Sequence, residues 1–488
     1  MTPTPDADPN PSAAGIADHA DAIEQFGYKQ ELKRTLTFSD LLIYGLIFMV
    51  PIAPFAIFGS VFQQSGGMVA LAYIIAMVGM MFSANSYAQM AQAFPMTGSV
   101  FTYVGRGTHR GAGFVAGWMI LLDYILVPAL LYLAAALAMA SFVPDVPVWA
   151  WVIVFVVLNT VINYFGITLT ARVNKYMLVA ELIVLAIFLA VGIWAVASGR
   201  GHFSFEAFFN PHTFTFAVVF GAASIAVLSF LGFDAISTLA EENAGTSKQL
   251  GRSMVFSLLI VGALFVVQTW VAAMLVEDPS TLIAKGDVAG TAFYDAAAFA
   301  GGPWLGVLTA VATAIAWGFA DAMVAQAATS RLLFAMARDR QLPKFLRQVN
   351  RKHKVPTNAT FLVAAISLAI GIPLASLPDG LTVISSLVNF GALTAFLMLN
   401  VAVVWWFVVK HRSRRWFLHL VFPVLGFLVL IAVVWNAQVA AQTLGFIWLA
   451  LGIVLAIILG LRGRLRDPLS MQAAESAEAE DDAHDAEK

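Results

Sequence analysis

Four acidic side chains stand inside long apolar stretches of the sequence, where a carboxylate has chemical consequences. They are Asp123, Glu181, Asp234 and Asp321. A charge held at the centre of a bilayer costs about 2.5–3.5 kcal/mol on insertion scales, so each acid kept there needs a reason. The same stretches hold almost no lysine or arginine. We expect every histidine to lie in a loop or a tail, and therefore expect no buried imidazole. A carboxylate can carry a proton or pair with an amine, so this interior favours a cationic or zwitterionic solute over an anion.

The elements that must position these acids are membrane-spanning helices. Of the 488 residues, 60% are hydrophobic and 11% are charged, whereas soluble proteins carry about 25% charged residues. A helix needs about 20 mostly apolar residues to cross a bilayer. The apolar runs cover roughly 38–64, 67–92, 113–142, 148–169, 176–198, 215–240, 253–276, 303–328, 358–376, 381–409, 416–436 and 442–462. We therefore predict an all-α integral membrane protein with about twelve transmembrane helices.

Basic residues predict the orientation of these spans, because Lys and Arg accumulate on the cytoplasmic side of a membrane. With the N-terminus inside, the outward loops hold only Arg200 and Lys285 of the 27 basic residues. We expect a disordered cytosolic tail over residues 1–34, one transporter-type membrane domain over 35–462, and an acidic cytosolic tail over 463–488. The start of the chain lacks the basic region and apolar core of a cleaved signal.

The first and sixth spans carry helix-breaking sequences. The run Pro-Ile-Ala-Pro at residues 51–54 interrupts the first span, since two prolines cannot continue a regular helix without freeing backbone carbonyls. The sixth span contains Ser-Phe-Leu-Gly-Phe-Asp at residues 229–234, with an acid after a mid-span glycine. Broken helices at matching places in two halves of a chain indicate the binding site of a secondary transporter. The simpler interpretation is an ordinary proline kink and a tolerated glycine.

Several motifs carry a family resemblance. They are Leu-Lys-Arg-Thr-Leu at residues 32–36, Phe-Leu-Gly-Phe-Asp at 230–234 followed by Glu241-Glu242, and Ser-Arg-Leu-Leu-Phe-Ala-Met-Ala-Arg-Asp at 330–339 followed by Leu342-Pro343. From Leu32 to about Leu461 the chain resembles the amino acid–polyamine–organocation (APC) superfamily of permeases. Gly117-Trp118 and Leu122-Asp123-Tyr124 in the third span resemble the bacterial putrescine-importer branch of that superfamily most closely.

The resemblance implies a five-plus-five inverted repeat with broken helices 1 and 6 and two peripheral helices. It also implies alternating access in a bacterial cell membrane, with proton-coupled uptake (symport) or exchange. Two departures leave the solute open between an amino acid and a polyamine. Amino acid carriers of the family usually have a Gly-Ser-Gly loop where this chain has residues 51–55, and the putrescine branch tends to carry an Asp where this chain has Ala56.

Glu181 falls where proton-coupled amino acid carriers of the family commonly have a lysine in span five, with Val173-Asn174 aligned before it. The resemblance places this position beside the broken first helix, where sodium-driven relatives hold sodium. A carboxylate there could hold a proton, ligate a cation or pair with a substrate amine. The alternative is a neutral Glu hydrogen-bonded to the carbonyls of span one. We predict Glu181 as the proton-coupling acid.

Asp123 and Asp321 lie in spans three and eight, which correspond if the halves are related. Trp118 and Trp317 precede them by similar intervals, which predicts a similar depth for the two acids. Facing one cavity, they could hold the two ends of a diamine, or one amine and a proton. The alternative is local capping near a helix kink, because Pro128 frees a carbonyl close to Asp123.

Asp234 follows the glycine break and can cap the second half-helix, so its structural interpretation is strong. Phe230 and Phe233 are candidate aromatic gates, and Glu241 is a candidate cytosolic gate or a solvated acid. Carbonyls of the unwound first span could coordinate an ammonium, and half-helix N–H groups could receive a carboxylate. The full predicted substrate-binding set is Pro51, Ile52, Ala53, Pro54, Phe55, Asp123, Phe230, Gly232, Phe233, Asp234 and Asp321.

Other classes of function lack their signatures. The sequence has no cysteine, no metal-ligand cluster, no Ser-His-Asp candidates within the spans and no phosphate-binding loop, so we expect no enzyme, cofactor, metal or nucleic-acid partner. We interpret the stretch 330–343 as a basic cytosolic hinge region. We predict a secondary active transporter for an amino acid or a polyamine, with a proton or another cation as coupling ion. An exchanger, a channel and a non-transporting sensor are the alternatives, and the oligomeric state is open.

Overall fold

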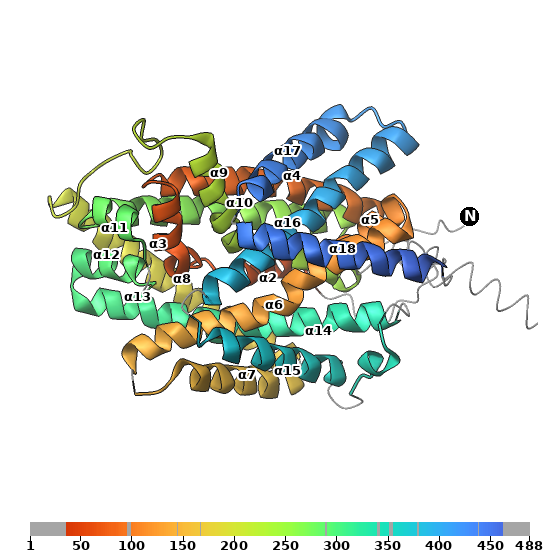
Figure 1. The fold of residues 1–488 in the computed structure, drawn as a ribbon, viewed down its shortest axis with the longest axis horizontal. Helices are drawn as coiled ribbons and strands as arrows, with labels where there is room; N and C mark the ends of the chain where they lie inside the picture. Colours follow the sequence, from red (N-terminus) through yellow and green to blue (C-terminus); the bar gives the residue numbers. More distant parts are fainter. Residues whose placement is uncertain are drawn as a thin grey trace, which may run out of the picture.

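A computed structural model describes residues 36–461 except 95–98, 144, 166, 288–289, 339–341, 351–354, 378–379 and 438. Within these residues ten helices are long and apolar enough to cross a membrane, and α2 (Phe38–Phe48) and α7 (Val148–Tyr164) are shorter apolar helices. The long helices run side by side in one bundle (Figure 1). The prediction of an all-helical membrane fold is confirmed, and both predicted tails lie outside the described residues.

The helices follow the predicted spans in order. The first five spans are α2 with α3 (Pro54–Gln64), α4 (Val69–Ala93), α6 (Arg110–Phe142), α7 and α8 (Ile167–Ala197). The next five are α9 (Phe216–Ala226) with the 3-10 helices η1 (Val227–Phe230) and η2 (Phe233–Glu242), α10 (Ser247–Ala273), α13 (Pro303–Ile315) with η3 (Ala316–Asp321) and α14 (Ala322–Arg338), α15 (Thr357–Leu374), and α16 (Gly380–Val403) with η5 (Val404–Lys410). The last two are η6 (Phe417–Val421) with α17 (Phe422–Trp435), and α18 (Val439–Leu461). Short connecting helices are α5 (Val100–Gly107), α11 (Pro279–Lys285), α12 (Ala292–Gly301) and η4 (Lys344–Arg347).

The break in the first span lies where the two prolines predict it. Thr37 and Asp40 form a capping box that starts α2, which ends at Phe48. The second half-helix, α3, begins with Pro54 at its first position, where a missing N–H costs nothing. Between them Val50 has a φ of 46°, a left-handed conformation that a β-branched residue rarely adopts.

The break in the sixth span contacts the first break. Gly232 has a φ of 110°, and a Cβ built on it would collide with the ring of Phe48. Glycine is therefore required for two reasons, the backbone conformation and the close approach. In addition, α3 packs against α9 and α2 packs against η2, so the half-helices pair across the bundle.

The eighth span, predicted as an apolar run over 303–328, is not a regular α-helix throughout. Its middle, η3, is a π-helix of six residues, and α14 then continues to Arg338. The interpretation of residues 330–343 as a hinge was therefore wrong for the first part of that stretch. Leu332, Leu333 and Met336 are buried, which explains why the helix extends beyond the predicted end of the span.

One end of the bundle is marked by α5 and by the end of α14 (Figure 1). Arg106 lies on α5, and Lys344 and Arg347 lie on η4, which packs against α14, so we call it the basic end. The other end carries α11 and α12. At the basic end the chain before α2 is tied to the chain after η2, because Ala244 N–H donates to the Leu36 carbonyl at 2.9 Å.

Candidate functional site

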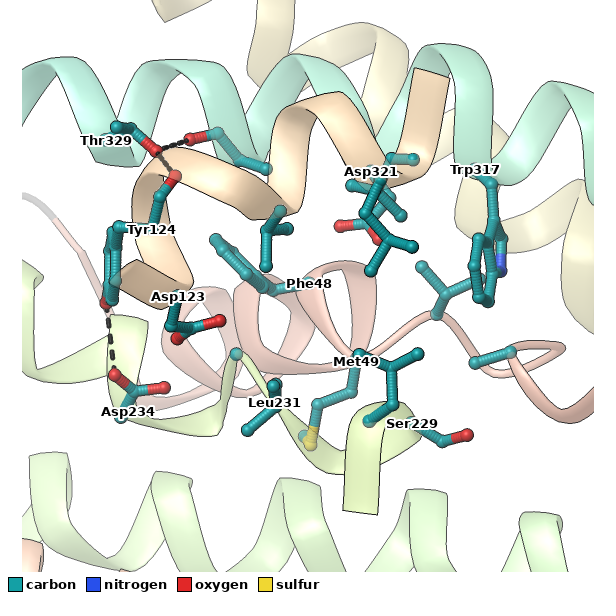
Figure 2. Close-up of a pocket in the computed structure, with 18 residues that line it drawn as sticks. Phe48, Met49, Asp123, Tyr124, Ser229, Leu231, Asp234, Trp317, Asp321 and Thr329 are labelled. Carbon is teal, nitrogen blue, oxygen red and sulfur yellow. Dashed lines mark hydrogen bonds between the residues drawn. The ribbon is translucent and has the colours of Figure 1, made fainter. Parts of the chain in front are cut away.

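A cavity of about 50 Å³ lies where the broken first and sixth spans meet α6 and the eighth span. That volume is several times the minimum that holds one water molecule. Three carboxylates line it, those of Asp123, Asp234 and Asp321, and its lining includes no lysine, arginine or histidine. Gly232 and Ala53 also line it, so five of the predicted site residues meet here (Figure 2).

Asp123 and Asp234 lie together at one end of the cavity (Figure 2). The Tyr124 hydroxyl donates to Asp234 Oδ2 at 3.1 Å. Asp234 also lies in the first turn of η2, with backbone N–H groups at the start of that helix near its carboxylate. Asp123 is 5% exposed, and its Oδ1 has no hydrogen-bond partner among the described residues.

A proline in α6 explains how this end is held. Pro128 has no N–H to give the carbonyl four residues earlier, which belongs to Tyr124. Thr329 of α14 supplies the missing donor, and its hydroxyl lies 2.5 Å from the Tyr124 carbonyl oxygen. The two helices are thereby joined directly behind the Tyr124 ring that contacts Asp234 (Figure 2).

Asp321 and Glu181 form the second acidic pair. Asp321 ends the π-helix η3 and is 7% exposed. Glu181 is 6% exposed on α8, which packs against both α2 and η3, and it interacts electrostatically with Asp321. Glu181 does not line the cavity itself. In the described part of the chain, Asp321 Oδ1 and Glu181 Oε2 have no hydrogen-bond partner.

A polar face of α7 holds the π-helix η3 and the start of α14. The residues of this face were not among the predicted site residues. Asn159 Nδ2 donates to the Gly318 carbonyl of η3 at 2.8 Å. Asn163 Nδ2 donates to the Met323 carbonyl at 3.0 Å and to Gln326 Oε1 at 2.8 Å. The available signal was the pair of asparagines four residues apart, which share one face of an otherwise apolar helix.

The middle of the cavity is apolar. Figure 2 shows the Phe48 side chain between Asp123 and Asp321. Other apolar side chains complete the lining, namely Met49, Val50, Val127, Leu130, Leu131, Leu228 and Leu231. Trp317 also lines the cavity beside Asp321, whereas Trp118 stacks on Trp448 of α18 with ring centroids 4.3 Å apart. The two tryptophans therefore have different surroundings, and only Trp317 contributes to the cavity.

The remaining predicted residues of the first span face the protein core. The Pro51 carbonyl accepts from Gln268 Nε2 at 2.9 Å, and the Ile52 carbonyl accepts from Phe55 N–H at 3.0 Å. Phe55 stacks on Phe293 with centroids 3.9 Å apart. Pro51, Ile52, Pro54 and Phe55 are absent from the cavity lining. The carbonyls that proline was expected to free for a solute thus have donors within the protein.

The two predicted aromatic gates also point into the core. Phe230 packs against Phe265, with centroids 5.1 Å apart, and Phe233 packs against Phe396, with centroids 5.5 Å apart. Neither lines the cavity, and Phe48 is the aromatic ring that does. Glu241 lies in the last turn of η2, but its side chain falls outside the described residues.

One histidine corrects an expectation from the sequence. His419 lies in η6 at the start of the eleventh span and is only 4% exposed. Its ring stacks on Phe407, with centroids 4.0 Å apart, and its nitrogens face Ser413 Oγ and Gln89 Oε1. A buried imidazole is therefore present, although it does not line the cavity.

A second and larger cavity, of about 340 Å³, lies toward the end that carries α12. Leu228 lines both cavities. The larger cavity has many polar side chains at its wall, with Gln63, Gln64 and Asn389 among its lining residues. Asp287 also lines it and accepts from Thr291 N–H at 2.9 Å, so its carboxylate is held at the start of α12. We call this larger cavity the vestibule.

The chemistry available in the central cavity is the binding of positive charge. Three carboxylates without a basic neighbour on the lining attract a cation, and the apolar middle suits a hydrocarbon chain. Among the described residues no group of three His, Cys, Asp or Glu is placed to hold a metal ion.

Comparisons with known proteins are consistent with this geometry. Residues 36–459 match the family model described as amino acid permease. The chain is 30% identical over 440 residues to the low-affinity putrescine importer PlaP of Escherichia coli (strain K12), covering 87% of this chain and 93% of that protein. It is 26% identical over 423 residues to the branched-chain amino acid permease BcaP of Bacillus subtilis (strain 168), covering 79% and 83%. It is 25% identical over 405 residues to a methylthioribose transporter of the same bacterium, covering 77% and 81%.

Proposed function

Because the chain belongs to the amino acid permease family of membrane transporters, we propose that it imports a cationic amine, with a short linear diamine as its preferred solute. The observation that carries the proposal is the central cavity, which has three carboxylates and no basic side chain on its lining. One of the similar proteins is named a putrescine importer, which agrees with this charge pattern.

The arrangement of the acids favours a solute with two separated amines. One acidic pair, Asp123 with Asp234, lies at one end of the cavity, and Asp321 lies beyond Phe48 (Figure 2). An ammonium at each end would neutralise one carboxylate there, so that one acid of the Asp123–Asp234 pair would hold a proton, and the carbon chain between the ammonium groups would pack on the apolar middle. A buried ion pair is favourable only when each charge finds its partner, which a dication of matching length provides.

An amino acid is the second candidate. Trp317 lines the cavity and its indole N–H has no hydrogen-bond partner among the described residues, so it could donate to a solute carboxylate. This single neutral donor would have to offset repulsion from three nearby acids. A zwitterion is therefore the weaker fit.

We propose that the Glu181–Asp321 pair couples transport to protons. Two neighbouring buried carboxylates repel each other when both are ionised, so the pair is stabilised by one proton or by one cation. An arriving ammonium at Asp321 and a proton on Glu181 would together neutralise the pair. Transport would then move a proton with the amine, and Glu181→Gln would keep binding but lose proton-driven accumulation.

The route across the protein follows from the two cavities. We propose that the basic end faces the cytoplasm in the cell membrane, since basic residues accumulate on that side. The vestibule then faces outward, and Leu228 lies between it and the central cavity. Alternating access would open this passage and the basic end in turn.

Uptake by proteoliposomes tests the proposal. Purified protein is reconstituted, an inward proton gradient is imposed, and radiolabelled putrescine is compared with labelled leucine and lysine. We expect accumulation of putrescine that a protonophore abolishes, and little uptake of leucine. Uptake of leucine without putrescine would overturn the amine assignment, and putrescine uptake indifferent to the protonophore would overturn the coupling.

A further inference from the structure

Four buried hydroxyl groups lie together between the Asp123–Asp234 pair and the basic end. They belong to Tyr87 on α4, Ser99 just before α5, Tyr103 on α5, and Ser237 on η2. All four side chains are at most 1% exposed. Each tyrosine hydroxyl has a serine hydroxyl as its polar neighbour, and none of the four oxygens has a hydrogen-bond partner within 3.5 Å among the described residues. We call these residues the hydroxyl cluster.

The hydroxyl cluster is contiguous. The rings of Tyr87 and Tyr103 meet edge to face with centroids 5.9 Å apart. Ser99 lies beside the Tyr87 hydroxyl, and Ser237 lies beside the Tyr103 hydroxyl. The four groups therefore form two neighbouring pairs rather than four isolated sites.

One side of the cluster reaches the acids of the cavity. Tyr87 interacts electrostatically with both Asp234 and Asp123, and its ring packs against Phe233, the residue before Asp234, with centroids 5.6 Å apart. Ser237 lies three residues beyond Asp234 on η2, about one turn of a 3-10 helix. The other side reaches α5, which carries Arg106 and lies at the basic end (Figure 1).

Packing alone does not explain these residues. A buried polar group without a hydrogen bond costs roughly 1–3 kcal/mol, so phenylalanine and alanine would be the cheaper choice at such positions. A hydroxyl both donates and accepts a proton, which neither of those side chains can do. The cluster, which reaches the acids through Tyr87, can therefore carry protons, which the same side chains without their oxygens could not.

We propose that the hydroxyl cluster is the proton-relay path between the Asp123–Asp234 pair and the basic end. The inference rests on the proton-coupled uptake in the proposed function. It adds a second proton site to the Glu181–Asp321 pair, namely the acid of the Asp123–Asp234 pair that a single bound ammonium leaves unneutralised.

The protonated acid of the Asp123–Asp234 pair passes its proton to the Tyr87 oxygen while Tyr87 passes its own hydroxyl proton to the Ser99 oxygen. When the basic end opens during the transport cycle, Ser99 passes its proton onward to bulk water there. Each O–H bond that breaks is replaced by one that forms, and rotation of the hydroxyls restores the path.

Substituting Tyr87→Phe tests the relay, because it removes the hydroxyl and keeps the ring. Tyr132→Phe is the matched control, since the Tyr132 hydroxyl is also buried without a partner among the described residues but lines neither cavity and lies outside the cluster. For each full-length variant in proteoliposomes, proton-driven putrescine uptake and internal acidification are measured beside putrescine counterflow at equal pH. Counterflow exchanges solute for solute and needs no net proton movement.

We expect Tyr87→Phe to slow proton-driven uptake and acidification by about tenfold or more, as loss of a proton-transfer group does. Counterflow should stay within about twofold of the unaltered protein, and Tyr132→Phe should leave both rates near normal. Ser99→Ala should reproduce the loss if Tyr87→Phe reconstitutes poorly. Equal loss of counterflow and of proton-driven uptake would overturn the relay, because the cluster would then serve folding or solute passage.

The two proposals fail in different ways. If the unaltered protein accumulates putrescine without acidification, the proton coupling itself is wrong and the relay falls with it. If the unaltered protein acidifies the vesicles and Tyr87→Phe with Ser99→Ala does so equally fast, only the relay is wrong.

Discussion

The two acidic pairs of the site differ in what surrounds them. Asp234 accepts a hydrogen bond from Tyr124 and lies at the start of a helix, with the hydroxyl cluster beyond it. Asp321 and Glu181 have each other as charged neighbours and, on Asp321 Oδ1 and Glu181 Oε2, no donor in the described part of the chain. Asp234 is thus built into the protein's hydrogen bonds. By contrast, Asp123 in the first pair and both acids of the second pair each have, among the described residues, a buried oxygen without a donor.

This difference assigns different tasks to the two pairs. A carboxylate that already accepts protein hydrogen bonds is stabilised whether or not a solute is bound. A buried pair without donors needs a proton or a cation, so it responds to what enters the cavity. We therefore expect Asp321 to contribute more to amine binding than Asp234, and the following variants test that ranking.

Asp321→Asn should have the largest effect on transport. Hydrogen bonds to charged groups contribute about 1.5–3 kcal/mol, which corresponds to roughly 10–100-fold in affinity. We expect kcat/KM for putrescine to fall by that factor, while the protein still folds because asparagine has nearly the same shape. Initial uptake rates over a range of putrescine concentrations give the value.

Asp234→Asn is the matched comparison, since it removes a carboxylate of the same cavity but leaves an oxygen for Tyr124. A smaller loss of kcat/KM than in Asp321→Asn supports the ranking. An equal or larger loss would mean that both pairs bind solute charge alike.

Gly232→Ala should have the next largest effect, because it should lower both the stability of the protein and the rate of transport. The left-handed backbone costs a non-glycine residue about 1–2 kcal/mol, and the new methyl group would meet the Phe48 ring. Because Phe48 lies between the two acidic pairs, its displacement should also lower transport. Thermal unfolding in detergent and putrescine uptake are measured side by side.

Phe48→Leu combined with Gly232→Ala separates the two causes. The smaller side chain should restore part of the transport lost in Gly232→Ala, but not the backbone strain. No recovery of transport in the double variant would show that backbone strain, and not the ring, accounts for the loss.

Asn159→Ala should give a moderate effect that reaches the solute only through Asp321. Losing the hydrogen bond to the Gly318 carbonyl should loosen η3 and raise KM for putrescine by a few-fold, with kcat less affected. Asn400→Ala is the control, because Asn400 is a buried asparagine that bonds Ser86 and Ser83 outside the cavity lining. It should lower the melting temperature similarly and leave KM unchanged. A rise in KM for both variants would mark a general loss of packing.

The sequence predicted some parts of this arrangement better than others, for physical reasons. Proline and glycine act through the local backbone, so the breaks at residues 51–54 and at Gly232 could be located from the residue types alone. Acids in apolar runs could be recognised one at a time. The grouping of these acids depends on tertiary contacts, which the sequence does not show. The π-helix η3 and the hydrogen bond that Gln268 donates to the Pro51 carbonyl are likewise not marked by any local sequence pattern. The same limit applies to Phe230 and Phe233, because periodicity cannot distinguish a core ring from a gate.

Substitution of Asp287 should have the smallest effect on transport. Asp287 lies outside the spans and its carboxylate is already hydrogen-bonded, so it contrasts with the acids of the central cavity. Burial raises its pKa above the usual range, despite the N–H groups of Thr291 and Ala292. A raised pKa in the folded protein means that its contribution to stability is present below the unfolded pKa, about 3.9, and is lost as pH rises through the folded pKa. Asp287→Asn cannot ionise, so its melting temperature relative to the unaltered protein should rise by about 1–2 °C between pH 4 and pH 7. Putrescine uptake should change little. A loss of uptake as large as that of Asp321→Asn would mean that the vestibule, and not the unpartnered pair, determines the preference for cations.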